Sequence, residues 1–248
     1  MLQAPPRAAP SGPALIRLLA RLADVDVPES RQSLSDRLSQ WLGWTDAIAL
    51  SSALNGNPPA VAAGARGFGG AEEDECVRVR GALAKAVAGD SVFAGTRRRG
   101  HGQTHMQMQD APADYAVFRQ RYLAIQQSME TGIAALRGRL RSMLAARTPA
   151  MARLAMIDAV MERALSERER NLLASVPGLL AGHFERLRAA EEQALATAET
   201  AEASEDAAPV TPGAWLDVFR KDMQSVLLAE LEVRFQPVEG LLAALRTR

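Results

Sequence analysis

The chain has few of the residues around which many functional sites are built. Of its 248 residues one is a cysteine, Cys76, and two are lysines. The single thiol excludes an internal disulfide and a cysteine-rich metal knuckle, and it suits a reducing compartment, so we expect a cytoplasmic protein. No run of apolar residues approaches the roughly 18 to 20 that a membrane-spanning helix needs.

Aromatic residues are also scarce, and neither sign of charge is in excess. Aromatics make up 4% of the chain, and 29 basic residues face 29 acidic ones. Because β-rich cores use many valine and aromatic side chains, this composition predicts an all-α fold packed by leucine, alanine and methionine. With no net charge, no overall field attracts nucleic acid or an anionic membrane, so any such binding has to come from a local patch.

The motifs that mark common enzyme classes are missing. The sequence contains no GxSxG, P-loop, GxGxxG or HExxH motif. None of its three histidines has an evident serine or carboxylate partner in the sequence. We therefore predict no enzymatic activity and no cofactor.

The first 112 residues alternate short helical patterns with loop-like segments. Residues 1–13, rich in proline and alanine, are expected to be disordered. Apolar spacing over 14–54 predicts a pair of helices, the second covering about 31–54. The range 55–112 reads as loop-rich, with one helix at about 72–88 whose first turn is acidic.

Residues 113–248 predict a bundle of long helices. From Tyr115 to Met143 apolar residues recur every three or four positions with one skip, which is a heptad stripe with a stutter. Thr148-Pro149 and Thr211-Pro212 are helix-start signals. We expect a long antiparallel helical hairpin of coiled-coil type, 114–146 against 149 to about 200, followed by an acidic linker over 200–211 and a third helix.

Two prolines punctuate the predicted helices, and charge favours their antiparallel pairing. Pro177 predicts a restart or kink, and Pro237 a bend or a new cap close to the C-terminus. The range 113–153 holds seven arginines against two acidic residues, whereas acidic residues dominate the return segment. Opposite charges on the flanks favour this register, within one chain or between two. The arginines are Arg119, Arg121, Arg137, Arg139, Arg141, Arg147 and Arg153.

Trp41 and Trp44 are the aromatic residues of greatest interest. Spaced by three, they would lie on one side of the helix predicted over 31–54 and pack against the first helix. If one of them is exposed instead, it has the character of a hot spot for binding a partner protein.

Two other constellations carry weaker signals. Cys76, His101 and His105 include an H-x3-H spacing that suits zinc on a helical turn, but the histidines lie in a Gly/Gln stretch, so we predict a buried Cys76 and no metal. The basic cluster Arg97, Arg98 and Arg99 suits phosphate binding. Without interleaved aromatics to stack bases, a solvated loop is the preferred interpretation.

Three segments carry a family resemblance: ALIRLLARLADVDVPESRQSLSDRLSQWLGWTDAIALSSAL, ALSERERNLLASVPGLLAGHFERLR and MQSVLLAELEVRFQPVEGLLAAL. With them the chain resembles, over nearly its full length, an uncharacterised family of proteobacterial proteins classed as a domain of unknown function. The resemblance implies a bacterial protein with no catalytic residues to transfer. Through the gene neighbourhood of relatives, it also implies a peripheral link to an envelope complex.

The sequence as a whole predicts a non-enzymatic helical interaction or scaffold protein that forms a homodimer. The expected alternative is a nucleic-acid-associated protein that uses Arg97 to Arg99 and the arginine-rich helix. For the homodimer, the heptad pattern places these residues among the seam: Tyr122, Met129, Leu136, Leu140, Leu165 and Phe219.

Overall fold

A computed structural model of the chain describes residues 12–28, 30–56, 70–93, 113–200 and 211–247. Within these ranges the fold is helical and without strands, which confirms the predicted all-α class. The helices are α1 (Ala14–Ala23), α2 (Leu34–Trp41), α3 (Trp44–Asn55), α4 (Gly70–Ala88), α5 (Tyr115–Ala145), α6 (Pro149–Leu173), α7 (Val176–Thr200) and α8 (Ala214–Arg246). None of the helices so described is long and apolar enough to cross a membrane.

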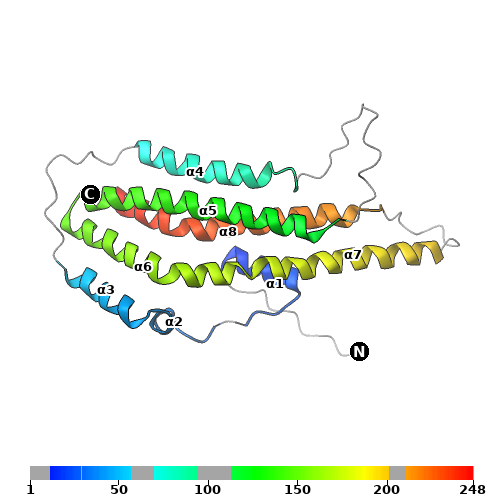
Figure 1. Cartoon of the computed structure of the whole chain (residues 1–248), viewed down its shortest axis with the longest axis horizontal. Coiled ribbons are helices and arrows are strands. Elements are labelled where there is room, and N and C mark those ends of the chain that lie inside the picture. Colours follow the sequence, from blue (N-terminus) through cyan, green and yellow to red (C-terminus); the bar gives the residue numbers. More distant parts are fainter. Residues whose placement is uncertain (1–11, 29, 57–69, 94–112, 201–210, 248) are drawn as a thin grey trace.

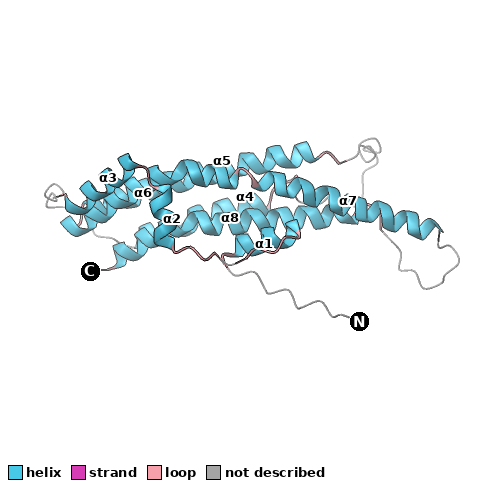
Figure 2. Ribbon diagram, turned by 90° about the horizontal axis from the view of Figure 1, so that it is seen from below, coloured by secondary structure: helices cyan, strands magenta, loops and turns pink. Residues whose placement is uncertain are grey.

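The helices form an elongated bundle around two long central ones (Figure 1). Helices α5 and α8 lie side by side, and α4 covers them as an outer layer. Helices α6 and α7 follow one another on the other side, where α3 packs on α6 and α1 packs on α7 and α8. Figure 2, turned by 90°, shows that the C-terminal end of α7 projects beyond the rest of the bundle.

The core is supplied mainly by α5 and α8. The heptad stripe predicted from Tyr115 onward faces this core, and nine residues of α5 and twelve of α8 are buried. Beside the start of α7 the core is aromatic, with ring centroids of Phe184 and Phe219 5.0 Å apart. Five of the six predicted seam residues belong to this single-chain core and are therefore not available to a second copy: Tyr122, Met129, Leu136, Leu140 and Phe219 are buried. Leu165 of α6 is partly buried and lies outside the core cluster.

Three predicted helix boundaries differ from the structure. The helix expected over about 31–54 is divided into α2 and α3 at Gly43, whose extended backbone caps α3. Helix α8 begins after Gly213, which adopts φ +83°, so Thr211-Pro212 precedes the helix instead of starting it. Pro237 lies inside α8, and the helix continues through it to Arg246.

Other predicted boundaries are confirmed. The side chain of Thr148 accepts a hydrogen bond from the Met151 amide at 3.2 Å, and Pro149 is the first residue of α6. Pro177 is the second residue of α7, where the chain restarts after Leu173. This restart redirects the chain, because α6 packs on α5 whereas α7 packs chiefly on α8 and α1. The predicted return segment therefore does not accompany the first long helix as one uninterrupted arm.

Much of what the sequence predicts outside the helices lies beyond the described residues. This applies to most of the N-terminal segment 1–13, to 57–69 and 94–112 on either side of the helix expected at about 72–88, and to most of the linker 200–211.

Candidate interaction surface

The two tryptophans of the α2–α3 segment lie on different helices. Trp41 is the last residue of α2 and Trp44 the first of α3, and extended backbone at Leu42 and Gly43 separates them. The guanidinium of Arg168 on α6 lies 4.7 Å from the centroid of the Trp41 ring. Trp44 is 83% exposed. The prediction that both indoles pack against the first helix is wrong, because Gly43 interrupts the helical face that they were expected to share.

Helix α3 presents an uncharged face to solvent. Trp44 and Ile48, four residues apart, lie next to each other on this face, and Ile48 is 51% exposed. Positions 47, 51 and 55 complete the same face with small or uncharged side chains, and all of them are exposed. We call these residues the α3 surface: Trp44, Ala47, Ile48, Ser51 and Asn55.

The one charged residue of α3 points the other way. Asp46 is 25% exposed, and its Oδ1 lies 3.8 Å from the guanidinium of Arg163 on α6. On the same inward side Ala53 is fully buried. A surface helix normally turns its charges to water and its large apolar residues to the core. Since α3 places Asp46 inward and Trp44 outward, its outer face differs from that of an ordinary solvated helix.

Exposed apolar side chains concentrate on the same part of the molecule. Among the described residues, seven of the fourteen exposed large apolar side chains belong to α2, α3 and α6. Helices α4, α5, α7 and α8, together more than twice as long, carry one each. Helix α6 fully buries two alanines, Ala152 and Ala155, and leaves Leu154 and Met156 exposed. Such concentrations on otherwise polar surfaces mark sites of interaction.

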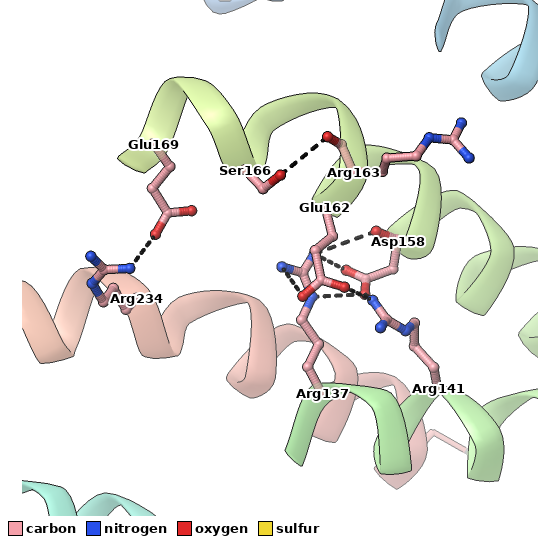
Figure 3. A network of polar contacts seen from close by, with 8 residues as sticks. All are labelled: Arg137, Arg141, Asp158, Glu162, Arg163, Ser166, Glu169 and Arg234. Carbon is pink, nitrogen blue, oxygen red and sulfur yellow. Dashed lines mark hydrogen bonds and ion pairs between the residues drawn. The ribbon is translucent and has the colours of Figure 1, made fainter. Parts of the chain in front are cut away.

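Helix α6 is held to α5 by a network of charged side chains (Figure 3). Arg137 donates two hydrogen bonds to the Asp158 carboxylate, at 2.8 Å from Nε and 2.6 Å from Nη2. Arg141 reaches the same carboxylate at 3.2 Å and pairs with Glu162. Opposite charges of the two segments thus meet here, and bidentate arginine–carboxylate pairs fix orientation well. They hold α6 in the position from which it supports α3.

A buried polar cluster ties α8 to α5 and α6. Glu230 is completely buried and accepts hydrogen bonds from Tyr122 at 2.7 Å, Gln126 at 3.0 Å and Arg234 at 2.8 Å. Arg234 also donates to Glu169 on α6 at 3.2 Å (Figure 3). Burial raises the pKa of Tyr122, and the Glu230 carboxylate beside it raises that pKa further. The phenol therefore stays protonated as a donor, and the cluster holds helices together without offering a free nucleophile.

Of the weaker predicted site residues, Cys76 alone lies in the described part of the chain. It is 3% exposed on the inner side of α4, as predicted, and burial raises the pKa of its thiol. His101, His105, Arg97, Arg98 and Arg99 lie outside the described residues. Within the described ranges, no group of three His, Cys, Asp or Glu side chains is arranged to hold a metal ion.

Most arginines of the predicted basic segment are engaged within the chain. Arg137 and Arg141 pair with α6, Arg139 pairs with Glu75 of α4 at 2.5 Å, and Arg121 pairs with Asp90. Arg147 donates to the Leu245 carbonyl. Five of the seven arginines are thus used to hold neighbouring segments to α5.

Comparison with known proteins gives one match. The model of the family described as "Protein of unknown function (DUF3348)" matches residues 1–247. No curated protein and no solved structure matches the chain. Because the family match covers nearly the whole sequence, the chain belongs to DUF3348, a family of proteins of unknown function, in agreement with the resemblance seen in its segments.

Proposed function

We propose that this protein is a non-enzymatic helical scaffold that self-associates through the α3 surface. The observation that carries the proposal is Trp44, 83% exposed in a helical face without charge. Tryptophan is one of the residues enriched among the hot spots near the centre of protein–protein interfaces, where its burial contributes a large share of the affinity.

A second copy of the chain fits this surface in charge. In a twofold interface the same patch meets itself, so a patch with charges of one sign would be repelled by its copy. The α3 surface carries no charge, and the guanidinium of the nearby Arg163 lies 3.8 Å from the Asp46 carboxylate. Two copies can therefore approach face to face without repulsion.

The exposed apolar area supports a dimer of moderate affinity. Trp44 alone leaves roughly 200 Å² in water, because a buried tryptophan covers up to about 250 Å². A standard interface buries about 800 Å² on each partner. Ile48 lies beside it on the α3 surface and extends the area. Leu54 of α3 and Leu34 of α2 are further exposed apolar residues of the α2–α3 segment.

The test is the oligomeric state of the full-length chain, measured by analytical ultracentrifugation over a wide concentration range. We expect a reversible dimer whose dissociation constant rises at least about tenfold in Trp44→Ala. Leu179→Ser, which changes an exposed apolar residue of α7, is the matched control and should leave the constant unchanged. A strict monomer at high concentration, or an equal effect of both substitutions, would rule out the α3 surface as the contact.

The alternative function, nucleic-acid binding, gains no support from α5, since four of its five arginines already pair within the chain. A cytoplasmic location and a bacterial origin stay part of the proposal. The single buried cysteine, which suits a reducing compartment, supports the former.

A further inference from the structure

Helix α4 lies on the outside of the bundle and packs against two helices that are distant in the sequence. Its neighbours are α8 and α5 (Figure 1). We call the face of α5 and α8 that α4 covers the α4 groove. The residues of this groove that contact α4 are Gly132 and Arg139 of α5 and Gln224, Glu232, Glu239 and Arg246 of α8.

The groove receives one apolar row of α4. Cys76, Val79, Leu83 and Val87 are spaced by three or four residues, and all of them are buried or packed against the core. Under this row α5 has a glycine, Gly132, where a Cβ atom would lie 3.8 Å from Leu83. That distance is an ordinary van der Waals contact, so Leu83 packs directly over this position of α5.

Polar side chains of the groove match charges along α4. Near its start Glu73 lies 2.7 Å from Arg246, and Glu75 pairs with Arg139. In the middle Arg80 donates to Glu239 at 2.8 Å and pairs with Glu232, with its guanidinium 5.5 Å from the centroid of the Phe235 ring.

The last carbonyls of α4 also have a partner in the groove. The Gln224 side-chain amide donates to the carbonyls of Val87 at 3.5 Å and Ala88 at 3.4 Å, where a helix leaves acceptors unpaired. The groove therefore recognises a helix by an acidic first part, a central arginine, an apolar row and a C-terminal end.

Helix α4 is held in the groove by contacts that are individually weak. The ion pairs of Arg80 and Arg246 are largely exposed to water, and pairs of this kind contribute about 0 to 1 kcal/mol each. The fully buried side chains of α4 are Cys76 and Val87, neither of them large. Elements with few buried apolar contacts open more easily than the rest of a fold.

The chain on either side of α4 is long enough to let it reach a neighbouring molecule. Positions 56–69 separate α3 from α4. After α4, Asp90 and Phe93 are buried against the bundle and would be exchanged together with the helix, which leaves positions 94–114 as the connection to α5. A stretch of this kind spans at most about 3.5 Å per residue, roughly 50 Å for the shorter one.

We propose that the α4 groove is a helix-binding site that accepts α4 of a second copy in exchange for its own. Exchange of an element between identical chains preserves each of its contacts and joins two molecules. Binding an amphipathic helix in a groove of this kind is a common mode of recognition. The proposal is independent of the α3 surface, because it uses the opposite layer of the bundle.

Two variants with reversed charge test it in full-length protein. The first is Arg80→Glu, and the second is Glu232→Arg with Glu239→Arg, both built in a Trp44→Ala background so that the α3 surface does not contribute. Alone, each variant opposes like charges across its own groove, so α4 opens more often. We therefore expect Cys76, the only thiol, to react with a maleimide at least about tenfold faster than in Trp44→Ala itself. When the two are mixed, exchange restores opposite charges in both grooves.

We therefore expect mixing to protect Cys76 again and to give heterodimers by native mass spectrometry. Unchanged reactivity after mixing without heterodimers would overturn the proposal, as would Cys76 protection in either variant alone. Should a variant not fold, a fluorescent peptide of residues 70–88 supplies the answer with Trp44→Ala protein. If the peptide binds saturably and the same peptide with Arg80→Glu does not, the groove accepts α4 from another molecule. If neither peptide binds, or both bind equally, the proposal is refuted.

Discussion

The most stringent prediction concerns the buried carboxylate of Glu230. Its two oxygens accept hydrogen bonds from three donors, and one of these is the guanidinium of Arg234, itself buried. Glu230→Gln keeps the shape of the side chain but removes the charge and places an amide NH₂ among donors. Arg234 would then be balanced by Glu169 alone, which is half-exposed at the edge of the cluster.

The expected magnitude follows from burial. Removing one partner of a buried ion pair costs about 3 to 5 kcal/mol, because the other charge is left without compensation. Since Glu169 still contacts Arg234, we expect the lower end, about 3 kcal/mol, which in a chain of this length lowers the Tm by about 6 to 12 °C. Urea unfolding followed by far-ultraviolet circular dichroism measures the loss.

Glu232→Gln is the matched control for that experiment. Glu232 lies on the same helix two residues further on, is 55% exposed, and pairs with a partly exposed Arg80. An exposed pair of this kind contributes about 0 to 1 kcal/mol. If Glu230→Gln destabilised the protein no more than Glu232→Gln does, the cluster would not contribute to stability as its burial implies.

Three further predictions address other parts of the fold. Burial raises the pKa of Tyr115 to about 12, so the stability contributed by its protonated phenol is complete below pH 10 and is lost as the pH rises towards 12. Tyr115→Phe should therefore reduce the loss of stability at alkaline pH by up to about 2 kcal/mol, measured as a pH series of urea midpoints. Pro237→Ala should raise the Tm, because a proline inside a helix costs up to about 3 kcal/mol and α8 continues through it; an unchanged or lower Tm would show that packing of the ring outweighs this cost. Sodium chloride at 1 M, where the screening length is about 3 Å, should increase the reactivity of Cys76 on the inner side of α4 without weakening a dimer formed by the uncharged α3 surface; weakening of the dimer by salt would contradict contact through that surface.

The long helices could be predicted because several local signals agree with their packing. In α5 the stripe from Phe118 to Leu140 has helical periodicity, and the same residues form the core. Thr148-Pro149 supplies both a capping oxygen and a first residue without an amide hydrogen, so the start of α6 is correct to the residue. Where neighbouring residues supply the hydrogen bonds of the backbone, the sequence is sufficient to predict the helix and its ends.

Single glycines explain two of the errors. Gly43 interrupts an apolar pattern that otherwise continues, and a glycine within a helix costs only about 1 kcal/mol relative to alanine, so periodicity alone does not reveal the break. That one residue moves Trp44 from the expected core to solvent. At the start of α8, Gly213 takes a backbone conformation with positive φ and moves the first turn two residues beyond the proline.

The buried polar cluster left a signal in the sequence that apolar periodicity passes over. Glu230 and Arg234 are four residues apart and occupy positions that continue the apolar row of α8 from Met223 and Val226. In a pattern based on hydrophobicity alone, these two charged residues appear as interruptions of the apolar row. An acidic and a basic residue that replace apolar residues at two successive stripe positions indicate instead that the row meets a polar partner inside the bundle, which Tyr122 and Gln126 supply.

The predicted dimer seam shows why the most regular positions are a poor guide to self-association. A heptad stripe indicates that one face of a helix is buried against other helices, but it does not indicate whether those helices belong to the same chain. Here Met129 and Leu136 are already buried within one chain, in which α8, α6 and α4 pack on α5. What one chain leaves uncovered is the α3 surface, on a helix whose outer and inner faces are both largely apolar and whose one charge turns inward. A contact between copies is therefore to be sought among the apolar residues that remain exposed after the single-chain core has formed, and Trp44, at 83%, is the most exposed of these in the described part of the chain.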